Sequence, residues 1–301
     1  MTELLPPSDE AQDVVIAPNK SAPLRERLYK IQEQKWVNYP AATTALRLLQ
    51  ETLDQPAADR CRCLNIQADT NNGKTALAKK FLRDLNKSTP KKNKDAAQIP
   101  GIHVQCPPSP NFNMLLSAIF REVDAPCKTT GRIEPKVHQL VRLAPSIGLR
   151  IIIIDEFHNL LSGTQKQQSD FLITLKWLTN ELRMPIVTMG TRESTRVLQT
   201  DPQLANRFRP YVLHPWKDLK EYAKFLAQFY SSMKLTGKNP FNSTKLVNKF
   251  LAMSEGLTGE SVDLMRVAAS LALEKGVETI DINLMDEVDW IMPTNRRDWI
   301  G

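Results

Sequence analysis

Hydrophobic and polar positions follow two different periods along the chain. Between Cys61 and Leu213, apolar runs of strand length are separated by stretches in which apolar residues recur every three or four positions. After Trp216, only the helical period remains. Strands that alternate with helices form a parallel sheet with helices on both faces. The pattern therefore predicts an α/β domain followed by a small all-helical domain.

This pattern also sets the expected elements. Five strands are expected at residues 63–68, 102–106, 151–155, 185–190 and, as a short piece, near 211–213. Helices are expected between them at 74–86, 111–123, 135–143, 171–182 and 192–198, and after them at 218–234, 243–254, 261–275 and 282–291. Asp218 and Ser261 are expected as N-caps. A helical pattern at 28–53, interrupted at Tyr39 and Pro40, precedes the first strand.

The chain divides into three parts on this basis. Residues 1–24 are expected to be a disordered leader, because they contain several prolines and few large apolar residues. Residues 25–214 are expected to form the α/β domain with a helical extension at its N-terminus. Residues 215–301 are expected to form the helical domain and a C-terminal tail.

The composition is that of a globular protein without a membrane span. Of the 301 residues, 42% are apolar and 24% are charged. No window approaches the roughly eighteen apolar residues of a span, and the first residues lack the apolar core of a signal peptide. We therefore expect a cytoplasmic protein with no membrane partner. The four cysteines lack zinc-site spacing and the four histidines are scattered, so reduced thiols are expected instead of a metal cluster.

One short segment after the first strand is rich in small and polar residues. It reads A-D-T-N-N-G-K-T, residues 68–75, and stands between an apolar run and a helix-favouring stretch. This is the setting of a phosphate-binding loop, in which backbone N–H groups and the helix dipole attract phosphate. Lys74 is expected to reach the β- and γ-phosphates, and the Thr75 hydroxyl to bind Mg²⁺. The expected nucleotide contacts are Asp69, Thr70, Asn71, Asn72, Gly73, Lys74, Thr75 and Ala76.

The same loop departs from the usual pattern at its start. Ala68 stands where such loops commonly have their first glycine. Alanine costs about 1 kcal/mol there if its φ is positive, and little otherwise. Since Gly73, Lys74 and Thr75 are present, we expect the loop to keep its function.

A second segment, R-I-I-I-I-D-E at residues 150–156, ends a strand buried on both faces with two acids. Asp155 is expected to hold Mg²⁺, and Glu156 to orient and deprotonate the attacking water. Parallel sheets bind ligands at the carboxyl ends of their strands, where both segments lie. Each segment alone could arise by chance, whereas the pair predicts an ATPase that uses ATP and Mg²⁺.

Positive charge is concentrated after the loop. The formal net charge is +7, and the stretch from Lys74 to Pro100 holds eight basic residues against two acidic ones. Such a cluster is suited to contact with a polyanion. For the lysines within 91–94 by themselves, a solvated loop is an equally good interpretation.

These segments together resemble the AAA+ ATPases, and within them the TniB/TnsC group of ATP-dependent regulators of DNA transposition. The similarity rests on W-V-N-Y-P before the first strand, D-T-N-N-G-K-T, I-I-I-I-D-E-F-H-N-L-L and P-I-V-T-M-G-T, and it covers residues 25–288. The resemblance implies an α/β P-loop AAA+ domain with a parallel five-stranded sheet, followed by a small all-helical lid domain.

The resemblance implies further roles by position. Thr191, just past the fourth strand, corresponds to the residue that senses the γ-phosphate, with Thr188 as the alternative. Arg207 corresponds to the arginine finger that completes a neighbouring subunit's site, with Arg209 as the alternative. A cation there stabilises charge that develops on the transferring phosphoryl group. Ordinary surface arginines are the competing interpretation.

The resemblance also concerns the adenine and the lid. Trp36 and Tyr39 are candidates for packing around adenine, or else form a core aromatic pair. Many AAA+ proteins carry an arginine at the start of the third lid helix, where this chain has Glu260. Arg266 lies about two turns later and is expected not to reach the nucleotide. We therefore expect weak coupling between nucleotide and lid, which would suit a slow ATPase.

For DNA, the resemblance points to two polar segments, 105–111 and 128–132. The expected DNA contacts are Ser109, Asn111, Lys128, Thr129, Thr130 and Arg132. Such side chains suit phosphate contacts, which carry no base information, and the sequence resembles no base-reading motif. Duplex binding is therefore expected to be largely independent of sequence and weakened by salt. A plain surface loop is the alternative for 128–132.

The leading hypothesis is an ATP-dependent regulator of transposition that forms a homo-oligomeric ring or helical filament on duplex DNA. Its expected partners are double-stranded DNA, a DDE-type transposase and, less directly indicated, a target-selection protein. Hydrolysis would disassemble the oligomer. One alternative is a helicase loader or replication initiator. Another is a nucleotide-gated scaffold without useful turnover, against which Glu156 argues, because binding alone requires no general base.

Overall fold

A five-stranded parallel sheet forms the centre of the larger part of the molecule. The computed structural model describes residues 22–298 apart from 57, 59, 90–97 and 129. The strand order is β2-β3-β4-β1-β5, and every pairing between neighbours is parallel. The strands are β1 (Cys63–Ala68), β2 (Gly101–Gln105), β3 (Ile151–Asp155), β4 (Ile186–Gly190) and β5 (Phe208–Leu213). The five predicted strands are confirmed, and the last one is longer than the short piece that was expected.

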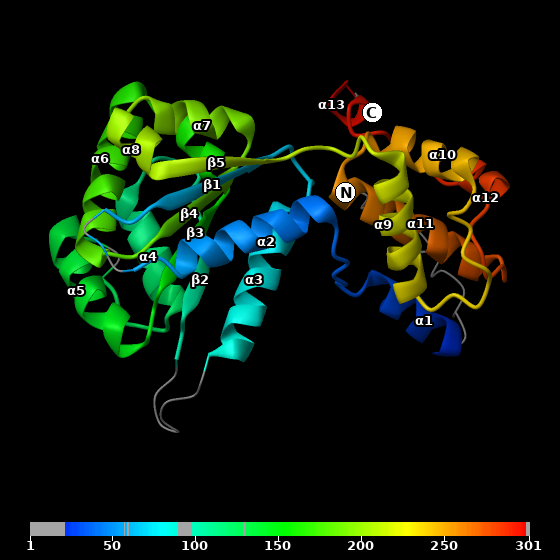
Figure 1. Ribbon diagram of the computed structural model, residues 1–301, viewed down its shortest axis with the longest axis horizontal. Coiled ribbons are helices and arrows are strands. Elements are labelled where there is room, and N and C mark those ends of the chain that lie inside the picture. The colour runs from blue at the N-terminus through cyan, green and yellow to red at the C-terminus, as the bar shows by residue number, and fades with distance from the viewer. Residues whose placement is uncertain (1–21, 57, 59, 90–97, 129, 299–301) are drawn as a thin grey trace, which may run out of the picture.

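Helices cover both faces of this sheet (Figure 1). They are α2 (Pro40–Leu53), α3 (Lys74–Ser88), α4 (Phe112–Glu122), α5 (Ile133–Ser146), η1 (Phe157–Ser162), α6 (Gln165–Leu182), α7 (Arg192–Gln199) and α8 (Pro202–Arg207). Strand β3 shows why two layers are needed. Ile152 and Ile154 pack in the core on the side of α4, α5 and α6, whereas Ile151 and Ile153 pack against α2 and α3. All four are fully buried, as the isoleucine run predicted.

Two short helices of this α/β part, η1 and α8, were not predicted from the sequence. In α8, Asp201 accepts hydrogen bonds from the backbone N–H groups of Gln203 and Leu204, and Pro202 occupies the first helical position. These are ordinary helix-start signals. Six residues make fewer than two turns, so the apolar period that reveals longer helices cannot show here.

The smaller part of the molecule is all helical. It contains α9 (Leu219–Ser232), α10 (Thr244–Ser254), α11 (Thr258–Glu274), α12 (Ile282–Asp286) and α13 (Asn295–Asp298). Asp218 caps α9 as predicted. Ser261 is not an N-cap, because α11 already begins at Thr258, and its buried hydroxyl lies 2.8 Å from the hydroxyl of Tyr222. The helix expected at 282–291 ends at Asp286.

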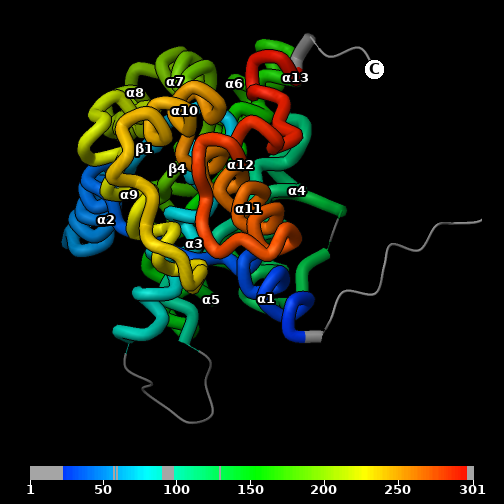
Figure 2. Tube along the Cα trace, turned by 90° about the vertical axis from the view of Figure 1, so that its right-hand side faces the viewer, coloured from blue at the N-terminus to red at the C-terminus, as the bar shows by residue number. Residues whose placement is uncertain are grey.

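Helix α1 (Ala22–Gln32) packs on this helical part, although the α/β part follows it in sequence. Ile31 is 1% exposed within the core of α9, α10 and α11, and Figures 1 and 2 show α1 beside α11. Arg27 and Glu278 form a double hydrogen bond of 2.7 and 2.6 Å between α1 and the segment before α12. The leader expected at 1–24 is corrected at its end, because α1 begins at Ala22; residues 1–21 lie outside the described residues.

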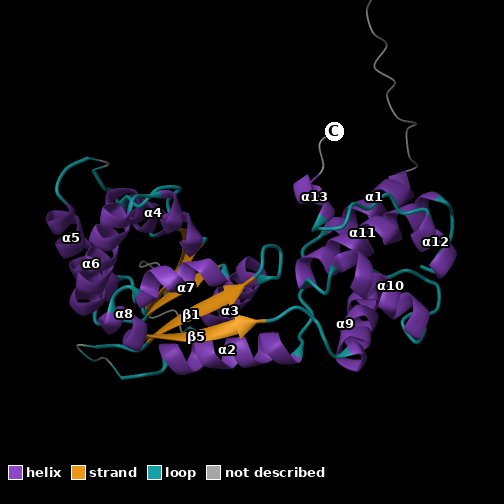
Figure 3. Cartoon of the chain, turned by 90° about the horizontal axis from the view of Figure 1, so that it is seen from above, coloured by secondary structure: helices purple, strands orange, loops and turns teal. Residues whose placement is uncertain are grey.

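The carboxyl ends of the strands are directed toward the helical part. Figure 3 shows β1 and β5 pointing at it. The chain crosses over after β5, and the backbone N–H of Trp216 donates to the carbonyl of Gly256 at 2.8 Å. The loop after β1 therefore lies between the two parts. Within the residues described, no helix has the length and apolar character that crossing a bilayer requires.

Candidate nucleotide site

The loop after β1 has a backbone that suits its residues. Asn71 and Gly73 have φ of +54° and +87°, in the left-handed region that Asn and Gly adopt most readily. Ala68 ends β1 without a positive φ, so alanine in place of glycine introduces no strain. Helix α3 begins at Lys74 and has fifteen residues. The N–H groups of the loop therefore stand at the positive end of a long helix.

Lys74 is buried beneath this loop. It is 6% exposed, and its Nζ donates to the carbonyl oxygens of Ala68 at 3.0 Å and Asp69 at 2.9 Å. Burial lowers the pKa of Lys74, while the carboxylates of Glu156, Asp155 and Asp69 act in the opposite direction. The ammonium group is thus held on the inner side of the loop, as a phosphate-binding lysine requires.

Asp155 receives polar contacts from three directions. Thr75 Oγ1 donates to its Oδ2 at 2.6 Å, and His103 Nε2 lies 3.1 Å from the same oxygen. The backbone N–H of Glu156 donates to Oδ1 at 2.8 Å. Burial raises the pKa of Asp155, but these hydrogen bonds outweigh burial and leave the pKa below its usual value. A carboxylate and a hydroxyl side by side are the hard oxygen ligands that Mg²⁺ prefers.

Glu156 has an uncommon backbone conformation, with φ of +54°. Its Oε2 lies 3.2 Å from Nε2 of His158. The other ring nitrogen of His158, Nδ1, is buried without a hydrogen-bond partner among the described residues. Both side chains line the same cavity as Lys74. Glu156 thus brings a carboxylate to the lining of the cavity, and its role as a general base stays a prediction.

A cavity of about 730 Å³ lies between the loop, α3 and the helical part. This volume is within the range of small-molecule sites, roughly 300–1,000 Å³. The lining includes the loop and several apolar side chains, namely Trp36, Val37, Tyr39, Phe225, Phe229 and Val262. The ring centroid of Tyr39 also lies 5.1 Å from that of Trp216 and 5.6 Å from that of Phe225. Tyr39 thus borders the cavity and packs in the aromatic core, and its contact with adenine stays a prediction.

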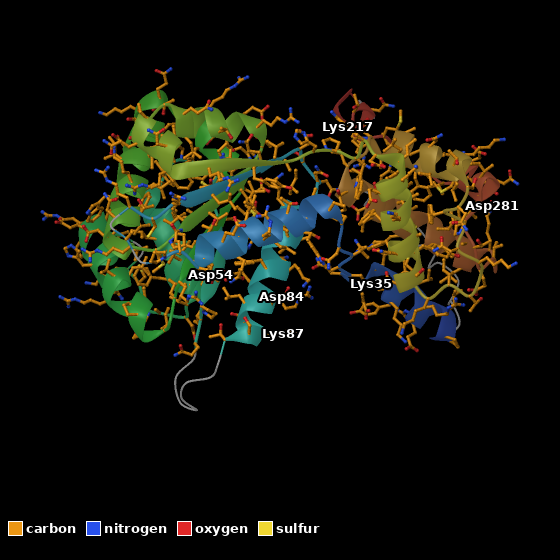
Figure 4. The ribbon with its side chains drawn as sticks, in the orientation of Figure 1. Lys35, Asp54, Asp84, Lys87, Lys217 and Asp281 are labelled. Atoms are coloured by element: carbon orange, nitrogen blue, oxygen red, sulfur yellow. The ribbon has the colours of Figure 1, made fainter. Side chains whose placement is uncertain are left out.

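Basic side chains besides Lys74 line this cavity. They are Lys35, Lys79, Lys80, Arg83 and Arg266. Figure 4 shows Lys35 on the segment that leads from α1 to α2, and Lys87 farther along α3. Burial lowers the pKa of Lys35. Cations from α3, α11 and the segment between α1 and α2 suit a ligand with several negative charges.

The helical part contacts the loop directly. The side-chain oxygen of Asn72 accepts from the backbone N–H of Thr258 at 2.9 Å, and the carbonyl of Asn71 accepts from the N–H of Gly259 at 2.9 Å. A Cβ on Gly259 would lie 2.3 Å from the backbone carbonyl oxygen of Asn71, so only glycine fits there while the loop contacts the helical part. Arg266 lines the cavity as well. From the sequence we expected weak coupling between nucleotide and lid, and this contact between the loop and the lid was not foreseen.

The two threonines considered as phosphate sensors differ in position. Thr188 is fully buried within the sheet, and its hydroxyl donates to Oδ1 of Asn65 at 3.1 Å. Thr191 is partly exposed at the carboxyl end of β4, one residue beyond Gly190, which pairs with Gln67 of β1. This places Thr191 level with the start of the loop. The geometry favours Thr191 over Thr188, and its role stays a prediction.

Arg207 lies at the amino-terminal end of the parallel strands, whereas the loop lies at their carboxyl-terminal end. Strand β5 pairs in parallel with β1, starting with Phe208 opposite Cys63. Arg207 therefore lies roughly 20 Å from the loop, the length of a six-residue strand. It is partly buried and donates to Oδ1 of Asn180 at 2.9 Å, whereas Arg209 is exposed. Neither arginine is near the loop of its own chain, as a residue acting on a neighbouring subunit requires.

The two segments considered for DNA binding meet at the start of α4. Asn111 caps this helix by accepting from the N–H of Met114 at 3.2 Å. Asn113 Nδ2 donates to the carbonyl of Gly131 at 3.3 Å, which joins the second segment to the first. Thr129 and the basic residues within 91–94 lie outside the described residues. The exposed candidates at this junction are Ser109, Asn111, Lys128, Thr130 and Arg132.

Comparison with known protein families shows which family the chain belongs to. A family model described as "Bacterial TniB protein" matches residues 27–218, which is more than half of the sequence. The chain belongs to the TniB family. No curated protein matches it. The resemblance to the TniB/TnsC group is thereby confirmed at the level of the family.

Solved structures share the fold of this TniB-family chain. The ORC2 protein of Aeropyrum pernix, in ADPNP–ADP complexes, is 15% identical with a TM-score of 0.65, over 90% of this chain and 74% of that one. The ORC1 protein of Aeropyrum pernix, in complex with DNA, is 22% identical with a TM-score of 0.62, over 87% and 68%. Domain III of the Thermotoga maritima replication initiation protein DnaA is 16% identical with a TM-score of 0.53, over 86% and 95%. These likenesses confirm the AAA+ P-loop fold with its helical region, and at such identities they show the fold alone.

Sequence reasoning missed three features of this TniB-family site. His103 reaches Asp155 from the neighbouring strand, and His158 contacts Glu156 from the turn that follows it. The contact of Asn71 with the start of α11 was the third. The only sequence signal for His158 was its closeness to Glu156 along the chain, and nothing in the sequence pointed to the other two.

Proposed function

We propose that this TniB-family protein is an ATPase that assembles on duplex DNA and regulates transposition. One observation carries the proposal. The hydroxyl of Thr75, which follows the loop after β1, donates a hydrogen bond of 2.6 Å to Oδ2 of Asp155 at the end of β3. They lie beside a cavity of about 730 Å³ that is lined by Lys74, Glu156 and basic side chains. Membership of the TniB family supports the link to transposition.

The residues of the cavity fit a nucleotide with magnesium. Thr75 Oγ1 and Asp155 Oδ2 would hold a Mg²⁺ ion, which when bound neutralises phosphate charge. Backbone N–H groups of the loop would bind the phosphates, and Lys74 would exchange the carbonyls of Ala68 and Asp69 for phosphate oxygens. The apolar side chains of the lining, Trp36 and Tyr39 among them, would contact the adenine.

Glu156 is the proposed general base. Its carboxylate would accept a proton from the attacking water, while Lys74 stabilises negative charge in the transition state. Thr191 is proposed to contact the γ-phosphate. Arg207 is proposed to complete the site of a neighbouring subunit, because a cation there stabilises the charge that develops on the transferring group.

The exposed polar segments at the start of α4 and α5 are the proposed DNA contacts. Lys128, Thr130 and Arg132, together with Ser109 and Asn111, would bind backbone phosphates without reading bases. ATP would promote assembly of copies on duplex DNA as a ring or filament. That assembly would recruit a DDE-type transposase, with a target-selection protein as a further partner, and hydrolysis would take it apart.

Calorimetry and DNA retardation test this function in turn. Folded wild-type protein is titrated with ATP and Mg²⁺, with Lys74→Ala as the control that should not bind. Retardation of duplex and single-stranded DNA is then compared at low and high salt. Absence of ATP uptake by the folded wild type overturns the whole proposal. Failure to retard duplex DNA at low salt overturns the DNA part, and preference for single strands would favour a helicase loader.

Glu156→Gln separates turnover from gating. The amide still accepts hydrogen bonds but cannot take the proton from water. Loss of phosphate release with prolonged assembly on DNA supports the ATPase. An unchanged rate of phosphate release would favour the nucleotide-gated scaffold.

A further inference from the structure

A buried carboxylate of the helical part touches the nucleotide loop. Glu260 is the third residue of α11 and is 4% exposed. Its Oε1 accepts a hydrogen bond from Nδ2 of Asn71 at 2.9 Å. The carbonyl of Asn71 in turn accepts from the N–H of Gly259 at 2.9 Å. Loop and lid therefore meet at a negatively charged point, next to the N–H groups that are proposed to bind phosphate.

An arginine from the C-terminal segment neutralises this carboxylate. Arg296 Nη1 donates to Oε1 of Glu260 at 2.9 Å, and Nη2 lies 2.8 Å from Oε2. The guanidinium is also held from its other sides. Nε donates to the carbonyl of Ile291 at 2.9 Å, and the central carbon lies 4.8 Å from the ring centroid of Trp290. Trp290 donates to the carbonyl of Met253 at 2.9 Å, which anchors the segment on the lid.

The charge of Glu260 matters because of what the loop is proposed to hold. A carboxylate without a cation would repel a triphosphate one side chain away, and burial strengthens that repulsion. A second acidic residue of the lid, Asp263, also contacts both Asn71 and an arginine. Asp263 Oδ2 accepts from Nδ2 of Asn71 at 3.1 Å, and its Oδ1 accepts from Arg266 at 3.2 Å. The lid thus presents each acid to the loop together with an arginine.

We propose that Arg296 is a positioning residue of the nucleotide site. By neutralising Glu260, it allows Asn71 to stay docked on the lid while the loop holds a triphosphate. This inference rests on the proposed function, because it assumes that the loop binds ATP. It places a determinant of nucleotide affinity outside residues 27–218, the region that the family model matches.

A double-mutant cycle on Glu260 and Arg296 in the full chain tests the inference. Glu260→Gln, Arg296→Ala and the double variant are titrated by calorimetry with a non-hydrolysable ATP analogue and Mg²⁺, and separately with ADP. Arg296→Ala should weaken binding of the analogue about tenfold, and binding of ADP less, because ADP carries less charge. The double variant should bind within about twofold of Glu260→Gln, since a neutral amide needs no cation. A purely structural role for Arg296 would not produce this rescue.

Lys275→Ala is the matched control. It also removes a cation from an ion pair, with Glu287, beyond the far end of α11, and should leave affinity unchanged. Thermal melting shows that each variant is folded, and Arg296→Gln takes the place of Arg296→Ala if the latter is not. An Arg296 variant that binds like the wild type, or a double variant as weak as Arg296→Ala, overturns the inference and leaves the proposed function standing. A wild type that binds no analogue overturns the proposed function first.

Discussion

Glu156 Oε2 and His158 Nε2 lie 3.2 Å apart, so the proposed general base is held by a residue of its own turn. The backbone of Glu156 has a positive φ of +54°. An uncommon conformation of this kind persists only where the surrounding structure supports it, and it is frequent at functional sites. The pair therefore gives the carboxylate a defined place beside Lys74.

His158→Asn is expected to lower the turnover number for ATP roughly tenfold with little change in KM, because the base loses its partner while the phosphate contacts remain. Steady-state phosphate release measures both constants. Glu156→Gln is the reference for complete loss of the base. A rise in KM equal to the fall in turnover would show that His158 supports binding instead.

Arg207→Ala is expected to bind ATP normally and to lose turnover, because the arginine lies at the end of the strands opposite to its own loop. Mixing it with Lys74→Ala protein should restore part of the activity, since some interfaces then join an intact loop to an intact arginine. Phosphate release from the mixture is the measurement. Arg209→Ala, at the exposed neighbouring position, is the control, and recovery in the Arg209→Ala mixture alone would move the role to Arg209.

Lys128→Ala combined with Arg132→Ala is expected to weaken duplex binding and to reduce its dependence on salt. Each lost phosphate contact should reduce the slope of log affinity against log salt concentration by about 0.9, so about 2 in total. Fluorescence anisotropy with labelled duplex measures the slope. Arg142→Ala, an exposed cation farther along α5, is the control. If the wild type, the double variant and Arg142→Ala showed equal salt slopes, this surface would not contact DNA.

Gly259→Ala is expected to weaken ATP binding about tenfold without lowering the melting temperature. A Cβ there would lie 2.3 Å from the carbonyl oxygen of Asn71, so the loop must leave the lid. Alanine is the better helix former by about 1 kcal/mol, which acts against any loss of stability. Calorimetry and melting give the two values. Val267→Ala, at an exposed position of the same helix, should change neither, and normal affinity in Gly259→Ala would show that docking is dispensable.

Stability is expected to depend on pH through the ion pair that ties α1 to the lid. The hydrogen bonds from Arg27 lower the pKa of Glu278 to about 2 from its ordinary 4.5. A lowered folded-state pKa stabilises the fold above pH 4.5, and this contribution is lost as pH falls toward about 2. Glu278→Gln should therefore melt slightly below the wild type at pH 7, and the gap should narrow as the pH falls below 4.5.

The expected gap at neutral pH is small, because the side chains of Arg27 and Glu278 are 39% and 33% exposed. Circular dichroism at a series of pH values measures it. Glu26→Gln removes a carboxylate from the exposed pair with Lys30 and should have no comparable effect. A gap that widens at low pH would contradict the assignment.

Local sequence patterns were sufficient to predict those elements whose hydrophobic pattern lies within a single strand or helix. The isoleucines of β3 predicted a strand buried on both faces, and Ile151 to Ile154 are fully buried. Strand β1, the loop after it and the start of α3 at Lys74 were placed in the same way. These elements are set by neighbours a few residues apart along the chain, and sequence order reports such neighbours directly.

Periodicity and residue chemistry are local properties, so they were enough to predict the succession of strands and helices along the chain and to name candidate residues for phosphate and magnesium. Which of these residues meet depends on how the chain folds in three dimensions. The tertiary structure placed His103 beside Asp155, α1 on the lid instead of the sheet, and Glu260 between Asn71 and Arg296. These contacts join residues between 36 and 251 positions apart. Such pairs form because burial and charge compensation bring distant surfaces together, and no spacing along the chain records that.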